Sequence, residues 1–264
     1  MGKALEIISG QATAPGAVLT NLVMNAGDSL TIRNNQNNTP IYLLSIWGKH
    51  QVAGNIIVRS PQLHDNRNGI FLFDPIGSSI PLTPYKMKQE LESQDTLVAQ
   101  ITGSAVAGDI ETASMLIFYE DLIGIDAHLI SPAELLSRSV DLMVVENTIA
   151  TGVVGNWSGE EAINAEIDNW KAKTDYALIG YNVSALCGAV RWVGSDIGNL
   201  AVGGPGSVLD KKTTSNWFVN LSEAMDLPLI PVFNSANKDS IFVSAHQDEN
   251  GVDVLVSSIF MQLN

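Results

Sequence analysis

The sequence predicts an all-β protein built from two consecutive β-sandwich halves. Short apolar stretches rich in β-branched and aromatic residues recur along most of the 264-residue chain, and Gly, Pro, Asn and Asp residues separate them. In addition, two apolar segments of the first half have counterparts near the end of the second half. A chain of this length can bury a substantial core, either as one large domain or as two domains of ordinary size.

Each expected strand is an apolar run that ends at a turn signal. Two such signals are Asn25-Ala26-Gly27-Asp28 and the asparagine-rich run 34–38. The strands expected in the first half are Ala17–Met24, Ser29–Arg33, Ile41–Trp47, Asn55–Arg59, Gly69–Phe73, Thr96–Thr102 and Ser114–Glu120. Those expected in the second half are Asp141–Glu146, Tyr176–Val183, Ala189–Val193, Trp217–Leu221, Ser240–His246 and Val252–Met261.

The most informative feature of the sequence is a similarity between two pairs of segments, one pair in each half, which we call the echo. Asp95–Ile101 and Ser114–Glu120 are matched by Asp239–Ala245 and Ser257–Gln262. The offset is 239 − 95 = 144 residues for the first segment and 260 − 118 = 142 for the second, so the intervening turns differ by two residues. Each copy predicts a hairpin that closes one half.

Weaker matches upstream of the echo keep the same order along the chain. Ile57–Ser60 corresponds to Trp192–Ser195, and Ile80–Leu82 corresponds to the proline-containing run Leu227–Pro231. Two all-β halves can also resemble each other because hairpins use the same residue types. Duplication and chance similarity therefore both stay open.

Two short helices interrupt the strand pattern. Ser131-Pro132-Ala133-Glu134 forms a capping box with Pro at the first helical position, which predicts a helix of about two turns. A second helix is expected over about 159–172, where Ile163, Ile167 and Trp170 would share one face. The expected organisation is a first sandwich over residues 1–125, a linker with the short helix over 126–140, and a second sandwich over 141–264.

The charge balance argues against direct binding of nucleic acid. The formal net charge is −14, from 28 acidic and 14 basic residues, which would repel a phosphate backbone. The adjacent basic pair Lys211-Lys212 falls short of a groove-tracking cluster and indicates a solvated loop. No apolar run approaches the roughly 18 residues of a membrane-spanning helix, so no transmembrane segment is expected.

Residues that usually carry metal or covalent chemistry are dispersed in the sequence. Cys187 lies in an apolar run, which indicates a small buried hydrophobe rather than a reactive thiol. The histidines form no His-x-His or Glu-x-x-His pair of the kind that brings metal ligands together; they are His50, His64, His128 and His246. We therefore expect no catalytic, cofactor-binding or metal-binding residues and no cofactor.

Two loops superficially resemble ligand-binding motifs. Asp248-Glu249-Asn250-Gly251 lacks the alternating ligands of a calcium loop, and its Asn-Gly pair predicts a hairpin turn. Gly203-Gly204-Pro205-Gly206 has the wrong spacing to Lys211 for a phosphate loop and is expected to be a mobile loop. Scattered carboxylates leave a glycosidase-type pair open, because such residues can meet from anywhere in the chain.

Two all-β halves, each ending in the Thr96–Glu120 or Ser240–Met261 echo, with a helix near the start of the second half, resemble the double jelly-roll major capsid proteins of tailless icosahedral viruses. The resemblance covers nearly the whole chain as architecture. It implies a non-enzymatic structural protein whose halves are jelly rolls standing side by side, with loops around Pro61–Asn68 and Gly194–Lys212 at the tower or rim.

The same resemblance implies partners and location. Three copies would form a homotrimer, a pseudo-hexagonal capsomer of the virion shell, after synthesis in the host cytoplasm; whether minor capsid or vertex proteins join the shell stays open. The alternative is a β-sandwich surface or carbohydrate-binding module of the fibre or adhesin type. In that case tryptophans would supply a sugar-stacking platform, although core packing would use most of them: Trp47, Trp157, Trp170, Trp192 and Trp217.

Overall fold

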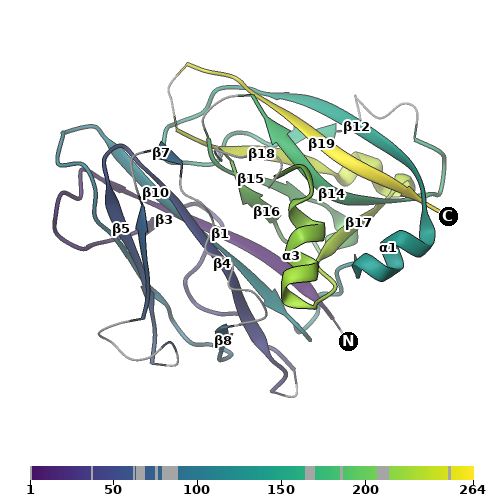
Figure 1. The fold of residues 1–264 in the computed structure, drawn as a ribbon, viewed down its shortest axis with the longest axis horizontal. Coiled ribbons are helices and arrows are strands. Elements are labelled where there is room, and N and C mark those ends of the chain that lie inside the picture. Colours follow the sequence, from purple (N-terminus) through teal and green to yellow (C-terminus); the bar gives the residue numbers. More distant parts are fainter. Residues whose placement is uncertain are drawn as a thin grey trace.

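The computed structural model shows an all-β protein in which antiparallel sheets form two sandwiches side by side (Figure 1). The strands of one sandwich all precede residue 120, and those of the other all follow residue 128. The division into domains and a linker at the expected boundaries stays a prediction. The structure describes residues 2–36, 38–61, 63, 69–74, 77–78, 89–163, 170–184, 187–206, 214–248 and 251–264.

The first sandwich has two sheets. One has the strand order β3-β1-β10-β4-β7, with β8 also paired to β4, and the other has the order β2-β9-β5-β6. The strands are β1 (Ala4–Thr13), β2 (Thr20–Asn21), β3 (Val23–Met24), β4 (Ile41–His50), β5 (Gly54–Arg59), β6 (Ile70–Asp74), β7 (Gly77–Ser78), β8 (Gln89–Leu91), β9 (Val98–Ile101) and β10 (Ile110–Tyr119).

The second sandwich also has two sheets, with the orders β11-β17-β14-β19-β12 and β13-β18-β15-β16. Its strands are β11 (Leu129–Ile130), β12 (Ser139–Ile149), β13 (Glu161–Ala162), β14 (Asp175–Val183), β15 (Cys187–Val193), β16 (Val202–Pro205), β17 (Ile230–Asn234), β18 (Phe242–Gln247) and β19 (Val254–Leu263). Its helices are α1 (Pro132–Arg138) and α3 (Trp217–Met225), with 3₁₀ helices at Ser195–Ile197 and Ser235–Ser240.

The two sandwiches share one strand order. The order β1-β10-β4-β8 in the first corresponds to β12-β19-β14-β17 in the second, and β2-β9-β5-β6 corresponds to β13-β18-β15-β16. The sequence echo falls on equivalent strands, because β9 matches β18 and β10 matches β19. The weaker match of β5 with β15 also falls on equivalent strands, so the expected correspondence is confirmed at these positions.

The expectation that each echo forms a hairpin is wrong. Strands β9 and β10 belong to different sheets, and so do β18 and β19. Each connection therefore crosses from one sheet of the sandwich to the other instead of folding back on its neighbour. Gly251 has a positive φ of 75°, as a turn glycine would, but Asn250 lies outside the described residues.

Several segments differ from the sequence-based expectation, in one case because an apolar run is ambiguous between strand and helix. Trp217–Leu221, expected as a strand, begins α3, whose buried residues recur at the helical spacing of three and four. Gly203–Pro205, expected as a loop, lies in β16, where a Cβ on Gly203 would meet Val190 O at 2.2 Å. Only Thr31 of the expected strand Ser29–Arg33 makes a bridge, to Thr96.

The helices agree with expectation in one case and not in the other. Ser131 Oγ accepts a hydrogen bond from the Glu134 backbone N–H at 3.2 Å, so the expected helix and its N-cap are confirmed, whereas Glu134 Oε1 accepts a hydrogen bond from Arg138 at 3.0 Å. The expected helix at 159–172 is wrong at its start, because Glu161–Ala162 forms β13, and residues 164–169 lie outside the described part. No helix in the described part is long and apolar enough to cross a membrane.

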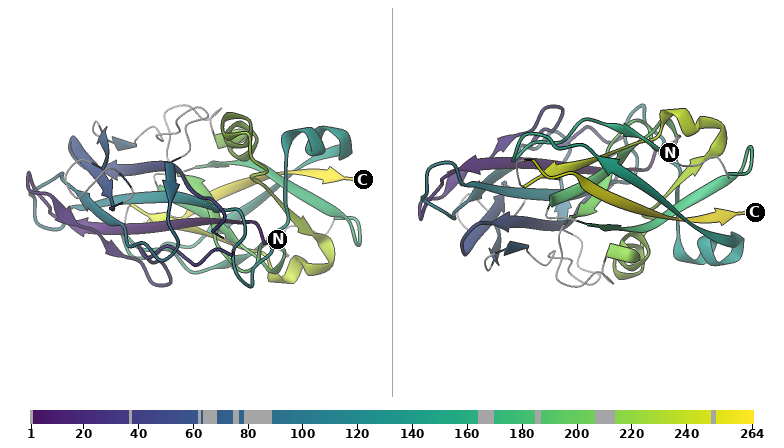
Figure 2. Two further views of the ribbon diagram at one scale, coloured as in Figure 1. Left: turned by 90° about the horizontal axis from the view of Figure 1, so that it is seen from below. Right: turned by 90° about the horizontal axis from the view of Figure 1, so that it is seen from above.

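The sheet of β1, β10 and β4 is buried on both faces. Ala4 and Ile8 of β1 pack in the core of the first sandwich, whereas Leu5 and Ile7 pack in a second core that continues into the other sandwich. Strands β1 and β10 contact β15 and β16 directly. The four sheets thus form a stack, in which β2-β9-β5-β6 and the sheet of β12 are outermost (Figure 1). In Figure 2 the first strands of the chain, in purple and blue, lie toward one end of the molecule, and the C-terminus lies at the other.

This shared core predicts that both sandwiches unfold together. Phe118 of β10 is fully buried in the core that spans the junction, so Phe118→Ala should cost about 3–5 kcal/mol of unfolding free energy. Calorimetry should show a single transition at a lower Tm. The exposed control Val106→Ala should change stability by less than about 0.5 kcal/mol. Two separate transitions, with only one shifted, would contradict the shared core.

Candidate functional site

Several buried charged and polar side chains meet at the junction between the sandwiches, and we take it as the candidate site. Trp47 of β4 donates its indole N–H to the Gly188 carbonyl of β15 at 3.0 Å and meets Trp217 edge-on at 6.1 Å between ring centroids. The backbone N–H of Ile7 donates to the Ala201 carbonyl at 2.8 Å. These contacts fix the position of the first sandwich on the second.

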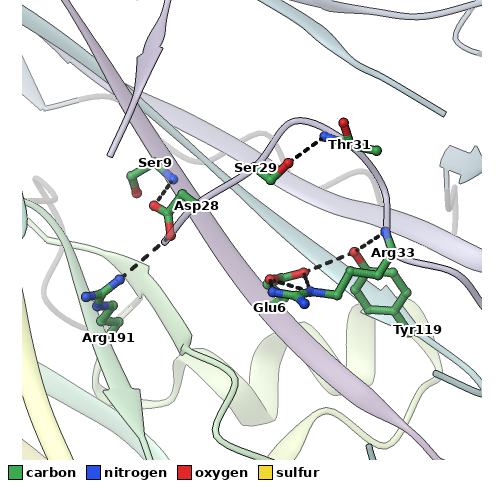
Figure 3. Close-up of polar contacts among 8 residues, drawn as sticks. All are labelled: Glu6, Ser9, Asp28, Ser29, Thr31, Arg33, Tyr119 and Arg191. Carbon is green, nitrogen blue, oxygen red and sulfur yellow. Dashed lines mark hydrogen bonds and ion pairs between the residues drawn. The ribbon is translucent and has the colours of Figure 1, made fainter. Parts of the chain in front are cut away.

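Asp28 lies in the turn after β3 and reaches across the junction (Figure 3). Its Oδ2 accepts hydrogen bonds from the Ser9 backbone N–H at 2.8 Å and from the Trp157 indole N–H at 3.1 Å. Its Oδ1 lies 3.7 Å from Arg191 Nη1. Burial raises the pKa of Asp28 above its usual value, and these donors only partly offset the rise.

Arg191 of β15 is the cationic partner from the second sandwich. Its guanidinium lies 4.3 Å from the centre of the Trp157 ring, and its Nε donates to Ser244 Oγ at 3.0 Å. Burial lowers the pKa of Arg191, while the carboxylates of Asp28 and Glu160 oppose this shift. The stacked and hydrogen-bonded geometry holds the guanidinium in one place.

The buried Glu6 carboxylate is the centre of a second cluster on the first sandwich, close to Asp28 (Figure 3). Arg33 binds its carboxylate in a two-pronged arrangement, with Nη2 at 2.7 Å from Oε1 and Nε at 3.1 Å from Oε2. The Tyr119 hydroxyl donates to Oε2 at 3.0 Å. Burial, followed by the neighbouring Glu6 carboxylate, raises the pKa of Tyr119 well above its ordinary value.

A pocket of about 260 Å³ opens beside these clusters and is lined by residues that include Glu6, Asp28, Arg33, Glu160 and Arg191. Protein donors already engage the Glu6 and Asp28 carboxylates at hydrogen-bonding distance. Each of these carboxylates therefore accepts its hydrogen bonds from neighbouring protein groups. Asp28 connects the two sandwiches through Trp157 and Arg191, whereas the contacts of Glu6 stay within the first sandwich.

A second ion pair crosses the junction at another position. Lys49 Nζ of β4 lies 3.1 Å from Asp248 Oδ2, just after β18, and the two side chains are only 8% and 3% exposed. Charges this deeply buried need their partner, because either one alone would face a large desolvation penalty. Asp248, whose loop superficially resembles a calcium motif, thus has a cationic partner across the junction.

His246 of β18 is fully buried at the same junction. Its ring meets the Trp157 ring edge-on, with 5.2 Å between centroids. Burial, with a further effect from Arg191, lowers the pKa of His246 to about 3. The imidazole is therefore neutral at physiological pH.

The residues weighed from the sequence occupy varied positions. His50 is buried and His128 is exposed, while His64 and Lys211-Lys212 lie outside the described residues. Cys187 is buried, as expected, and burial raises its pKa above the ordinary range. Among the described residues, no three His, Cys, Asp or Glu side chains are grouped to hold a metal ion.

The tryptophans pack mainly in the core. The four side chains at most 8% exposed are Trp47, Trp170, Trp192 and Trp217, which confirms core packing for most of them and leaves no tryptophan platform for sugar stacking. Trp157 is partly buried and is occupied by Arg191 and His246.

Sequence reasoning missed the junction pairs. Asp28 and Arg191 lie 163 residues apart, since 191 − 28 = 163, and Lys49 and Asp248 lie 199 apart, since 248 − 49 = 199. No local spacing connects such residues. Asp28 does belong to a turn signal, as the sequence indicates, but its charge gives no sign of its partner.

Comparison with known proteins yields structural likenesses of low similarity. No protein-family profile matches the sequence, and no curated protein sequence matches it. The PBSX exported protein XepA is 8% identical with a TM-score of 0.25, and the alignment covers 97% of this chain and 86% of that one. The top component of cowpea mosaic virus, a naturally occurring empty particle, is 8% identical with a TM-score of 0.20, covering 99% and 89%.

The Lys49–Asp248 pair can be tested by a double-mutant cycle. Lys49→Met should cost about 3–5 kcal/mol in urea unfolding, because it leaves the Asp248 carboxylate buried without its cation. The double variant Lys49→Met, Asp248→Leu should recover most of this loss, because no unpaired charge remains. A double variant no more stable than the single one would show that the pair is not coupled.

His246 predicts a specific loss of stability in acid. Its pKa is about 3 in the folded protein, whereas an imidazole fully accessible to water has a pKa of 6.5. The unfolded chain therefore binds more protons between these values, and stability is lost as pH falls from about 6.5 toward 3, by at most about 5 kcal/mol. His246→Gln should flatten the pH dependence in this window. An unchanged slope in urea titrations would contradict burial of a neutral imidazole.

Proposed function

We propose that the chain is the major capsid subunit of an icosahedral virus. It would be a non-enzymatic structural protein of the virion, built from two jelly rolls and assembling as pseudo-hexagonal homotrimers. The observation that carries the proposal is the shared strand order of the two sandwiches. In each, the eight corresponding strands form two four-stranded sheets, and the first strand pairs with the last, as in the double-sheet jelly rolls of viral capsid domains.

The junction supports the same proposal. Two buried ion pairs, a tryptophan hydrogen bond and a shared core hold the sandwiches in one fixed arrangement. A subunit with two similar lobes fixed side by side gives six near-equivalent lobes when three copies surround a closed axis. Six such lobes tile a shell hexagonally, so shape rather than chemistry would perform the function.

The alternative is a β-sandwich surface or carbohydrate-binding module. Jelly rolls also occur in lectins, so the strand order is compatible with it. The burial of four of the five tryptophans disfavours a stacking platform. The capsid proposal therefore explains more of the structure.

Oligomeric mass tests the proposal. Native mass spectrometry at micromolar concentration should show a trimer of three 28.3 kDa chains, and electron microscopy should show hexagonal particles. Because association buries a large interface, Tm should rise with protein concentration. A stable monomer that binds one class of glycan selectively on an array would overturn the capsid proposal and favour the binding module.

A further inference from the structure

Each of the two outermost sheets carries exposed apolar side chains on its outer face. In the first sandwich these are Phe71 and Phe73 of β6, which are 56% and 63% exposed. They are two residues apart in an edge strand and therefore point to the same side, away from the core that Ile70 and Leu72 contact. We call this pair the phenylalanine face.

The second sandwich has a matching feature on β12, the edge strand of its outer sheet. Leu142 and Val144 are 54% and 56% exposed and also share one face, where they pair across the ladder with Met261 and Ile259 of β19. Val140 and, in α1, Leu136 add exposed apolar surface just before them. We call Leu136, Val140, Leu142 and Val144 the aliphatic face.

The internal junction shows which of the two sheets of each sandwich pack against each other. Inside the chain, the sheet of β1 packs against the sheet of β18. By strand order, the sheet of β12 is the counterpart of the β1 sheet, and the sheet of β6 is the counterpart of the β18 sheet. The two outer sheets therefore correspond to the two sheets that pack together at the internal junction, but they lie on opposite sides of the stack. Figure 1 shows β5, the neighbour of β6, in one sandwich and β12 in the other.

We propose that the aliphatic face of one copy packs on the phenylalanine face of a second copy, head to tail, repeating the internal junction between molecules. This inference rests on the proposed self-assembly, and it assigns the two surfaces through which the copies would make contact. A head-to-tail contact covers both faces, whereas a two-fold contact would cover only one kind. Phenylalanine and aliphatic side chains supply the apolar centre that such interfaces need.

The contact is made through side-chain faces rather than by adding a strand to the β12 edge. The Asp141 carboxylate accepts a hydrogen bond from the Leu142 backbone N–H at 2.9 Å and so already occupies that amide. Acidic residues of this kind at sheet edges discourage strand pairing. The exposed parts of Phe71 and Phe73, 56% and 63% of their surfaces, would form the centre of an interface that needs roughly 800 Å² per partner.

Mixing two single variants tests the arrangement. Leu142→Lys damages the aliphatic face and Phe71→Lys damages the phenylalanine face; both positions are exposed, so the fold should persist, as a circular dichroism melt would verify. Each variant alone should be monomeric by native mass spectrometry. Mixed in equal amounts they should form a one-to-one heterodimer, because each retains the face that the other needs, and the damaged faces prevent a closed ring.

The controls separate this inference from the proposed function. Val153→Lys, at a position 68% exposed in the loop after β12, should associate like the unaltered chain. If the unaltered chain is a monomer, the assembly proposal fails and this inference fails with it. If the unaltered chain forms trimers and Leu142→Lys still does, only the assignment of the faces is wrong. A homodimer of Phe71→Lys alone would indicate a two-fold contact through β12 and would also overturn the head-to-tail arrangement.

Discussion

Burial of one sheet on both faces is the constraint on which the rest of this structure depends. In β1 and β10, alternate side chains must fit two different cores, so apolar residues occupy both faces of these strands. The polar groups that remain there must find partners within the protein. Ser9 and Ser114 satisfy each other at 2.8 Å, and Glu6 is held by Arg33 and Tyr119.

The same constraint explains the charged groups at the junction. Removing the Lys49–Asp248 and Asp28–Arg191 pairs from water is costly, and the attraction within each pair roughly offsets that cost. Their net contribution to stability is therefore small, but misplacing either partner would be expensive. Such pairs favour one relative position of the sandwiches over others that would bury a similar apolar area. A rigid subunit with a defined angle between its lobes is what a regular lattice requires.

Much of the fold could be predicted from the sequence, because most strands follow local apolar patterns and turn signals. The class, helix α1 with its Ser131 N-cap and the equivalence of β9 with β18 are confirmed. Strand β1 escapes prediction because Glu6 interrupts its apolar run, and the Arg33 and Tyr119 partners that permit its burial are distant in sequence. The start of α3 resembles a strand because Trp, Phe and Val favour strands, although tertiary packing decides otherwise. The junction pairs have no local signal at all.

The internal junction differs from the outer faces in that it buries charged groups as well as apolar side chains. Between the sandwiches, the chain itself keeps the partners together, so charged groups such as Lys49 and Asp248 can be desolvated without a large entropic cost of association. The outer faces instead present apolar side chains within polar surroundings. In the proposed contact between copies, burial of these apolar side chains would release ordered water. The chain connects the two sheets of the internal junction permanently, whereas the proposed contact between the outer sheets would depend on protein concentration.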